Sequence, residues 1–295
     1  MTGEPRRVKL NRSPCESGQL RMPTQTDEAS DYDFIINLIY ERSRIRLHDG
    51  KQQLIRARLG KRMRHHGFET LGQYCDYLRR TGDEDEITHM VDALSTNYTQ
   101  FLREKDHFDF LVGTALPKLV GNRKKFNIWS APCATGEEAY SIAFYLSEHF
   151  PVTAGWDWKI HATDVSTKAL NVAQKGVYQE ERLASLPPDW WRKYFQKGQG
   201  DFEGCYRVKQ PLMDRIQFKN VNLLGNYSMT EQFEVIFCRN MMIYFDRPTQ
   251  EQLVQRLSQF LVPNGYLLIG HSESLNGLNI GLRCLKPSIY QKEKA

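Results

Sequence analysis

Residues Trp129 to Ser141 read WSAPCATGEEAYS and place two adjacent carboxylates, Glu137 and Glu138, at the start of an expected helix. The helix follows an apolar run, a position where α/β proteins commonly bind nucleotide-like ligands. The segment holds one glycine, Gly136, where a phosphate loop has several glycines and a lysine. The two acids offset the positive end of the helix dipole, as they would also do in a purely structural role with Thr135 as cap. A pyrophosphate would bind poorly here, whereas S-adenosylmethionine, a cationic adenosine cofactor without phosphate, fits.

A second acid follows the next apolar run, in HATDVS. Asp164 lies where nucleotide-binding α/β folds place a carboxylate that accepts hydrogen bonds from ribose hydroxyls. The alternative is that Asp164 caps the helix expected from Ser166. Together with the paired glutamates, the pattern favours the ribose interpretation.

Polar side chains also follow a third apolar run, in FEVIFCRNMMIYFD. Arg239 and Asn240 come directly after the run, at the edge of the sheet where ligands bind, so a solvated surface role explains Arg239 poorly. Tyr244 could belong to the core with its hydroxyl satisfied, or it could line the reaction pocket. In VNLL, Asn222 and Leu223 could hold an adenine ring, although this string alone indicates little.

A further polar group lies in STNYTQFLRE, where Asn97, Thr99 and Arg103 are closely spaced. These residues could simply cap a helix and place an arginine on the surface. They also lie at the expected seam between two domains, and ligand sites often occur at such seams.

Two kinds of element must position these residues. Residues 31–95 contain four segments with helical spacing of apolar residues and predict a small all-α domain. From residue 96 to 295, strand and helix patterns alternate, which predicts an open α/β sheet with ligands at the carboxyl ends of its strands. Residues 177–213 interrupt this alternation with prolines, glycines and short β-type runs, and predict a small inserted β-subdomain. Residues 1–30 have few large apolar groups and predict a disordered tail.

The composition excludes several classes of protein. The chain has 295 residues, is 40% hydrophobic and carries a net charge of +5, so it can bury a core and does not require nucleic acid as a partner. No apolar run reaches the ~18 residues of a membrane span, and the N-terminus lacks the apolar region of a secretory signal. Its six cysteines are scattered and unpaired in sequence, which favours reduced thiols in the cytoplasm and predicts no metal site.

The motifs ALSTNYTQFLRE, WSAPCATGEEAYSIA, ATDVSTKAL, VNLL and FCRNMMIYFD occur in one order from about residue 32 to the end. In combination they resemble the chemotaxis receptor methyltransferases of the bacterial CheR family. The resemblance implies an N-terminal helical domain joined to a Rossmann-like S-adenosylmethionine methyltransferase domain with a small β-subdomain. This chain has Pro132 and Cys133 where family members often have Ser or Ala.

The resemblance also implies roles for the residues that match these motifs. It implies a catalytic or substrate-facing role for Arg103 and Tyr244, with no general base and S-adenosylhomocysteine as the product. The implied reaction forms methyl esters on receptor glutamates. The implied cofactor contacts are Asn97, Thr99, Arg103, Glu137, Asp164, Asn222, Leu223, Arg239 and, adjacent, Asn240. Glu137 rather than Glu138 is the expected contact, which leaves Glu138 to complement the helix dipole.

Two surfaces are candidates for partner binding. KQQLIRARLGKRMRHH has six Lys or Arg residues and no acid, with Ile55, Leu59 and Met63 on one stripe. A solvated face is the ordinary explanation for such a run, but the missing i, i+4 acids favour an acidic receptor bundle as partner. The basic residues expected to bind it are Arg56, Arg58, Lys61 and Arg62.

The second surface is the glycine-bearing KGQGDFEGCYRV, with Gly198, Gly200 and Gly204. It resembles the turn of family members that bind a receptor's C-terminal pentapeptide as an added strand, although an ordinary glycine hairpin explains it equally well.

We therefore predict a cytoplasmic, monomeric enzyme that is recruited to membrane chemoreceptors, is not inserted in the membrane and binds no nucleic acid. The alternatives are a nucleic-acid methyltransferase, a non-catalytic receptor adaptor and an NAD-type dehydrogenase. The last is disfavoured because the chain lacks G-x-G-x-x-G.

Overall fold

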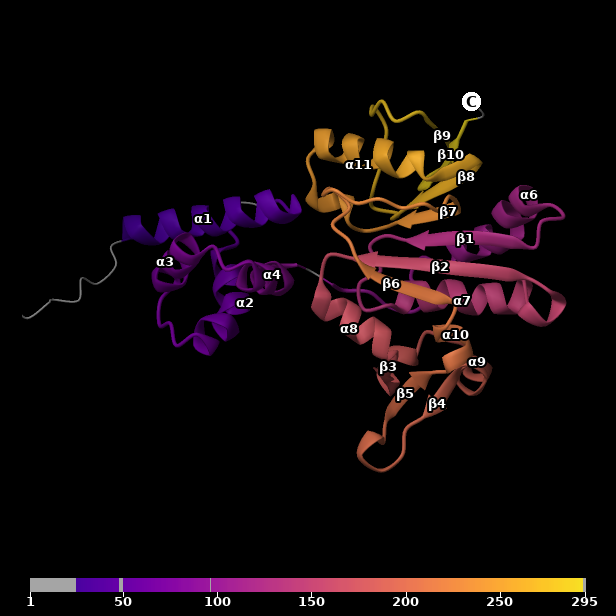
Figure 1. The fold of residues 1–295 in the computed structure, drawn as a ribbon, viewed down its shortest axis with the longest axis horizontal. Helices are drawn as coiled ribbons and strands as arrows, with labels where there is room; N and C mark the ends of the chain where they lie inside the picture. Colours follow the sequence, from indigo (N-terminus) through magenta and orange to yellow (C-terminus); the bar gives the residue numbers. More distant parts are fainter. Residues whose placement is uncertain (1–24, 48–49, 96, 294–295) are drawn as a thin grey trace, which may run out of the picture.

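The computed structural model describes residues 25–47, 50–95 and 97–293. Figure 1 shows a small helical domain beside a larger part that is built around a twisted sheet, with a second small sheet projecting from one end. Most of the predicted N-terminal tail, residues 1–24, lies outside the described residues. Residues 25–30 belong to helix α1 (Gln25–Ser43), so the prediction that they are part of a disordered tail is wrong.

The helical domain buries one apolar face of each of its helices in a common core. Ile55 and Leu59 are buried in this core and Met63 packs against it, so the predicted apolar stripe is confirmed. Thr70 forms a capping box with Gln73 at the start of the third helix. The remaining helices of the domain are α2 (Gln52–His65), α3 (Leu71–Thr81) and α4 (Glu84–Leu94).

The main sheet has seven strands in the order β6-β2-β1-β7-β8-β10-β9. The first five are parallel, while β10 runs antiparallel to β8 and to β9. The strands are β1 (Lys125–Ser130), β2 (Asp157–Asp164), β6 (Ile216–Asn220), β7 (Phe233–Cys238), β8 (Leu261–Ile269), β9 (Leu282–Lys286) and β10 (Ile289–Lys292). The predicted open α/β sheet is confirmed, and β9 is a strand that the sequence patterns did not indicate.

Helices cover both faces of this sheet (Figure 1). Because side chains alternate along a strand, Ile128 of β1 packs with the helices on one face and Trp129 packs on the other. The first face carries α5 (Asp106–Phe110), the π-helical turn η1 (Leu111–Ala115), α6 (Leu116–Val120), α7 (Glu137–His149) and α8 (Thr167–Lys175), and the second carries α11 (Arg247–Gln259). Short 3-10 turns are η2 (Val152–Ala154) and η5 (Met242–Tyr244).

The predicted insertion is a separate three-stranded antiparallel sheet in the order β3-β5-β4. It projects from the end of α8 (Figure 1). Its elements are β3 (Val177–Gln179), η3 (Glu180–Leu183), α9 (Pro188–Tyr194), β4 (Phe195–Lys197), η4 (Gly200–Phe202), β5 (Cys205–Val208) and α10 (Gln210–Met213). None of the helices in the described part of the chain is long and apolar enough to cross a membrane.

Candidate cofactor site

Two adjoining cavities lie where β1, β2 and β7 end at the same edge of the sheet. The first, here named the apolar cavity, separates this edge from the helical domain and is lined by residues that include Ile45, Leu54, Arg58, Asn222, Leu223, Tyr244 and Phe245. The second, the polar cavity, is lined by residues that include Tyr98, Thr99, Arg103, Glu138 and Arg239. The residues that line both are Asn97, Pro132, Asp164 and Asn240. An elongated ligand with an apolar end and a charged end would fit the two together.

Asp164 is buried at the end of β2, where the two cavities meet. One carboxylate oxygen accepts from the N–H of Ala134 at 2.8 Å, and the other accepts from the N–H of Ser166 at 2.8 Å. Burial raises the pKa of Asp164, although these N–H groups oppose the shift. The cap of α8 is Ser166, whose hydroxyl accepts from the N–H of Ala169, so the interpretation of Asp164 as that cap is wrong. Each oxygen of Asp164 keeps a lone pair for a ligand.

The turn before α7 depends on its single glycine. Gly136 has φ +98°, and a Cβ there would lie 2.8 Å from the Cβ of Ala173 and 3.0 Å from the hydroxyl oxygen of Tyr178. Any side chain would therefore both strain the backbone and collide with α8 and the insertion. Thr135 does not cap α7; its hydroxyl donates to the Glu137 carboxylate at 2.6 Å.

The two glutamates at the start of α7 face different surroundings. Glu137 is fully buried and forms an ion pair with Arg182, and it lines neither cavity. Glu138 lines the polar cavity, accepts a hydrogen bond from the hydroxyl of Ser130 at 2.6 Å and lies 3.4 Å from Arg239. Burial raises the pKa of Glu138, against the opposing charge of Arg239. Glu137, the expected cofactor contact, therefore lies outside both cavities, whereas Glu138 lines one of them; which of the two touches the cofactor stays a prediction.

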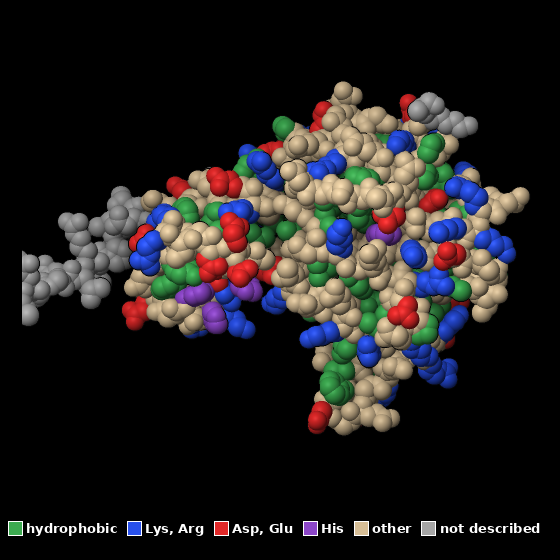
Figure 2. Space-filling model, in the orientation of Figure 1, with side chains coloured by type: hydrophobic (Ala, Val, Ile, Leu, Met, Phe, Trp, Pro, Cys, Tyr) green, Lys and Arg blue, Asp and Glu red, His purple; other side chains and the backbone are tan. Residues whose placement is uncertain are grey.

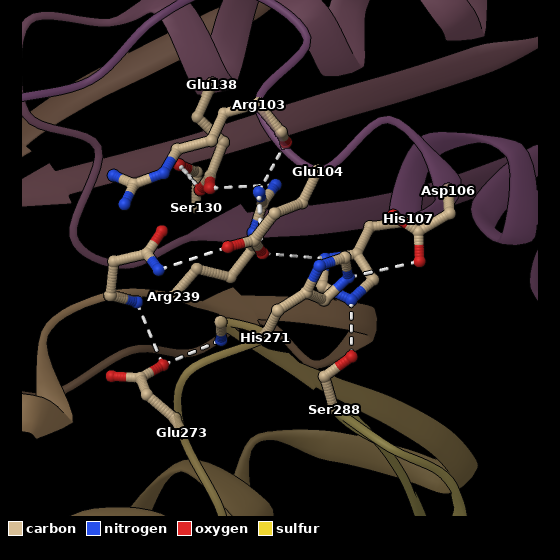
Figure 3. A network of polar contacts seen from close by, with 12 residues as sticks. Arg103, Glu104, Asp106, His107, Ser130, Glu138, Arg239, His271, Glu273 and Ser288 are labelled. Atoms are coloured by element: carbon tan, nitrogen blue, oxygen red, sulfur yellow. Dashed lines mark hydrogen bonds and ion pairs between the residues drawn. The ribbon is translucent and has the colours of Figure 1, made fainter.

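Arg239 is 5% exposed at the end of β7. Its Nε and Nη2 donate to Oε2 of Glu104 at 3.2 and 3.0 Å, and Nη2 also donates to the carbonyl of Arg103 (Figure 3). Its Nη1 has no hydrogen-bond acceptor among the described residues, although Glu138 lies within ion-pair distance. Burying a guanidinium N–H without an acceptor costs free energy, so Nη1 is a donor available to an anionic group in the polar cavity.

A buried carboxylate fixes the backbone of the loop that begins at Arg239. Glu273 accepts from the N–H groups of Asn240 (2.9 Å), Met242 (2.7 Å), Ile243 (3.3 Å) and, on its own segment, Gly270 (2.7 Å). Burial raises the pKa of Glu273, and these N–H groups oppose the shift. The three donors from the loop after β7 hold that loop in one conformation, which includes a left-handed Asn240 (φ 57°).

The predicted contacts outside these loops are also mostly at the cavities. Asn97 donates to the hydroxyl of Ser166 at 3.2 Å. Thr99, two positions later in the chain, is buried. Asn222 donates to the carbonyl of Arg42 at 2.9 Å, which joins this loop to the helical domain. Of the predicted cofactor contacts, only Glu137 lines neither cavity; Tyr244 lines the apolar cavity and Arg103 lines the polar one.

Family models match the chain in two adjoining stretches. Residues 97–290 match the S-adenosylmethionine-binding domain of CheR methyltransferases, and residues 30–95 match their all-α domain. A chemotaxis protein methyltransferase of Salmonella typhimurium is 39% identical over 96% of this chain and 99% of its own length. Similar proteins of the same name are 36% identical in Escherichia coli, over 95% and 98%, and 37% identical in Borreliella burgdorferi, over 88% and 92%.

The chain belongs to the CheR methyltransferase family. Its cofactor is S-adenosylmethionine, as the sequence motifs predicted, and its larger domain has the predicted Rossmann-like methyltransferase fold with an inserted β-subdomain. The comparisons do not favour a nucleic-acid methyltransferase or a non-catalytic adaptor.

Some basic residues of α2 have acidic partners on neighbouring helices, which the sequence of α2 does not indicate. Arg62 pairs with the buried Glu86. Burial alone would raise the pKa of Glu86, but hydrogen bonds from Arg62, His66 and Tyr74 outweigh it and lower the pKa. Arg56 pairs with Glu28 at 2.6 Å. The acids missing from α2 are therefore supplied by α1 and α4, and Figure 2 shows acidic and basic side chains interleaved over the helical domain.

Two other basic residues of α2 differ from these. Arg58 lines the apolar cavity and donates to the carbonyls of Leu94 and Ser95 at 2.7 and 3.0 Å, so its guanidinium has partners within the chain, and its role toward a receptor stays a prediction. Lys61 is exposed, as is Arg64, and the described residues offer neither of them an ion-pair partner.

The three glycines of the insertion lie around a hairpin between β4 and β5. Gly200 and Gly204 have φ of +59° and +79°, and a Cβ on Gly198 would collide with the backbone of Phe202. Phe202 itself is 65% exposed at this turn. Because β4 pairs with β5 and with no other strand of the described residues, its other edge can accept a further strand.

Sequence reasoning missed three carboxylates of the site: Glu104, Glu138 as a cavity residue, and Glu273. Glu104 directly follows Arg103 in the motif STNYTQFLRE, and its type and spacing alone do not distinguish it from a surface acid. Glu273 follows the apolar run GYLLIG, which is the same signal that singled out Arg239 after β7. Glu273 follows the parallel strand β8, so the rule that site residues follow parallel strands applies to it as well.

Proposed function

We propose that this CheR-family chain transfers the methyl group of S-adenosylmethionine to glutamate side chains of chemotaxis receptors and forms glutamyl methyl esters. The proposal rests chiefly on the paired cavities, which change from apolar to charged at Asp164. The relatives named above are chemotaxis protein methyltransferases, which supports a chemoreceptor as the substrate.

In the proposed binding mode, adenine occupies the apolar cavity beside Asn222 and Leu223, and the ribose hydroxyls donate to Asp164. The methionine end then lies in the polar cavity. Its carboxylate accepts from Nη1 of Arg239, which has no hydrogen-bond acceptor among the described residues, while Glu138 faces its ammonium group. Both ends of a zwitterion are thereby matched by opposite charges.

The reaction needs alignment more than acid–base chemistry. A glutamate side chain has an unperturbed pKa of about 4.3 and is already an anionic nucleophile at neutral pH. When bound, S-adenosylmethionine would supply an electrophilic methyl group, which would pass to a carboxylate oxygen while sulfur kept the electron pair of the broken bond and left as S-adenosylhomocysteine. Arg103, which is partly exposed at the polar cavity, is placed to aim the incoming carboxylate, and Tyr244 closes the neighbouring cavity.

Glu273 and Glu104 act as positioning residues in this scheme. Glu273 holds the backbone of the loop that carries Asn240, and Glu104 holds the Arg239 side chain. The enzyme therefore fixes the donors of the polar cavity before the cofactor arrives, so that little reorganisation is needed on binding.

Two surfaces support the proposed partner. Lys61 and Arg64 are two exposed cations of α2 that have no ion-pair partner among the described residues and suit an acidic receptor bundle. The free edge of β4, next to Phe202, suits a receptor C-terminal pentapeptide bound as an added strand. In this proposal the enzyme works as a cytoplasmic monomer that the receptor recruits to the membrane.

The decisive experiment incubates the purified chain with tritiated-methyl S-adenosylmethionine and receptor-containing membranes. We expect label on the receptor that mild base releases as methanol, because methyl esters hydrolyse readily. Base-stable label on the receptor would contradict ester formation, and label on added nucleic acid would contradict the choice of substrate.

A further inference from the structure

Three metal-ligating side chains meet behind the polar cavity. Glu104, His107 and His271 each offer one ligand atom, and these atoms lie within 4.8 Å of one another. Figure 3 shows both imidazole rings beside the Glu104 carboxylate. The ligands come from two distant parts of the chain: the segment that begins α5 and the segment that follows β8. This separation explains why no metal site was predicted from the sequence.

The hydrogen bonds of His107 assign its tautomer. The hydroxyl of Ser288 has one proton and two neighbours, the carbonyl of Pro287 at 2.6 Å and His107 Nε2 at 2.8 Å. With that hydroxyl assigned as the donor to the shorter contact, Nε2 carries the ring proton and donates to Ser288, and Nδ1 carries a lone pair. That Nδ1 is fully buried, has no hydrogen-bond partner among the described residues and points at Oε2 of Glu104, 3.5 Å away. A lone pair facing a carboxylate is repulsive unless a cation lies between them.

His271 completes the group with the same arrangement. Its Nε2 lies 3.1 Å from Oδ2 of Asp106, which leaves Nδ1 as the nitrogen available to the cluster. Metal-binding histidines characteristically donate their other ring N–H to a carboxylate, carbonyl or hydroxyl, which fixes the ring. Both histidines here have such a partner, Ser288 for one and Asp106 for the other.

We propose that Glu104, His107 and His271 form a binding site for a divalent transition-metal ion of the Zn²⁺ type. Two imidazoles and one carboxylate are a known zinc ligand set that leaves a fourth position open. Tetrahedral bonds of about 2.1 Å place ligand atoms about 3.4 Å apart, close to the 3.5 Å between His107 Nδ1 and Glu104 Oε2. His271 is about half exposed and can close the remaining gap by side-chain rotation.

The ion competes with Arg239 for Glu104. Arg239 donates twice to the same Oε2 that faces His107, so an ion at this oxygen weakens the arginine pair. Because Arg239 lines the polar cavity, metal binding and cofactor binding oppose each other. We expect saturating Zn²⁺ to raise the Kd of S-adenosylhomocysteine by about 10-fold, and the bound cofactor product to weaken Zn²⁺ by the same factor.

The test titrates the chelator-treated, tag-free full chain with Co²⁺, whose four-coordinate complexes absorb visible light, and then displaces it with Zn²⁺. We expect one site per chain. The first variant is His271→Ala, because that side chain is exposed enough to be removed without unfolding the protein. We expect it to weaken the metal at least about 10-fold, and Asp106→Asn to weaken it about 10-fold through its hold on His271. The matched control is His89→Ala, another exposed histidine, which should leave the titration unchanged.

Three results would overturn the proposal. The first is the absence of four-coordinate Co²⁺ absorption in the parent protein. The second is a titration that His271→Ala leaves intact, or that His89→Ala abolishes. The third is a cofactor-product Kd that saturating Zn²⁺ does not change, because that would place the ion away from Glu104. All three readouts measure binding directly and do not depend on which protein the enzyme methylates.

Discussion

The arginines of α2 and the arginine that follows β7 differ in how completely the fold supplies them with partners. On α2, Arg56 and Arg62 are matched by carboxylates from neighbouring helices, so their charge is used within the fold. After β7, Arg239 is more deeply buried, and one of its nitrogens still lacks an acceptor among the described residues. An incompletely satisfied buried cation is costly unless a ligand completes it, whereas a satisfied exposed cation is ordinary. The comparison teaches that burial without a full set of partners indicates function better than a run of charge does.

The largest expected effect comes from removing the incompletely satisfied cation. Arg239→Ala leaves Glu104 and Glu138 without their shared guanidinium and removes the proposed donor to the cofactor carboxylate. We expect kcat/KM to fall at least about 100-fold and the free energy of unfolding to fall by about 3 kcal/mol. Kinetics and urea unfolding measure the two losses. Arg283→Ala, an exposed arginine on β9, is the control and should change neither.

The next largest effect is expected at Arg62, whose charge is paired with the buried Glu86. Arg62→Ala should lower the free energy of unfolding by about 3 kcal/mol, because it leaves the buried Glu86 without its arginine. The Kd of S-adenosylmethionine should stay the same, since Arg62 lines neither cavity. Lys61→Ala, one position earlier on the same helix, should cost little stability. An Arg62→Ala protein as stable as the parent would remove the contrast between the two groups.

The two glutamates of α7 give the sharpest version of the same comparison. Glu138→Gln should raise the Kd of S-adenosylmethionine about 10- to 30-fold with little change in stability, because it loses a charge that faces the cofactor. Glu137→Gln should do the reverse, since its carboxylate pairs with Arg182 away from the cavities. Calorimetry and urea unfolding of both variants check this. The opposite pattern would return the cofactor contact to Glu137.

A smaller effect is expected at the exposed cations of α2. Changing Lys61 and Arg64 to Glu should slow receptor methylation about 3- to 10-fold at low salt, with less effect at high salt and an unchanged cofactor Kd. Rates on receptor membranes at two salt concentrations measure it. A uniform loss at both concentrations would argue against an electrostatic docking surface.

The smallest effect is a pH dependence of stability. The pKa of Glu86 is lower in the folded protein than in an unfolded chain, so its contribution is complete above the unfolded value of about 4.3. It is lost as the pH falls through the folded value. Urea unfolding between about pH 6 and about pH 3 should therefore show a steeper loss in the parent than in Glu86→Gln. Glu84→Gln, an exposed acid on the same helix, should follow the parent.

The sequence predicted many of the residues that line the two cavities, because the carboxyl ends of parallel strands must meet. Asp164 and Arg239 follow separate strands and do line the same cavity. The sequence could not show which of Glu137 and Glu138 faces the cavity. Successive residues of a helix point about 100° apart, and the backbone conformation of Gly136 sets which of the two faces it.

The ion pairs of the helical domain were not predictable for a different reason. Glu86 reaches Arg62 from another helix, and the sequence of α2 contains no trace of it. The α/β fold and the insertion followed from local patterns, whereas β9, an exposed edge strand, has no apolar alternation that would indicate it.

The close contact at Gly136 links the inserted β-subdomain to the turn before α7. The hydroxyl of Tyr178, at the base of the insertion, donates to the carbonyl of Thr135 at 2.8 Å, and Gly136 leaves no space between this tyrosine, α8 and the cofactor turn. Tyr178 of the β-subdomain is thus in direct contact with the turn before α7. A receptor tail held at the far edge of the β-subdomain would be anchored to the enzyme. The length of the receptor's own flexible linker would then set the effective concentration of its glutamates at the site.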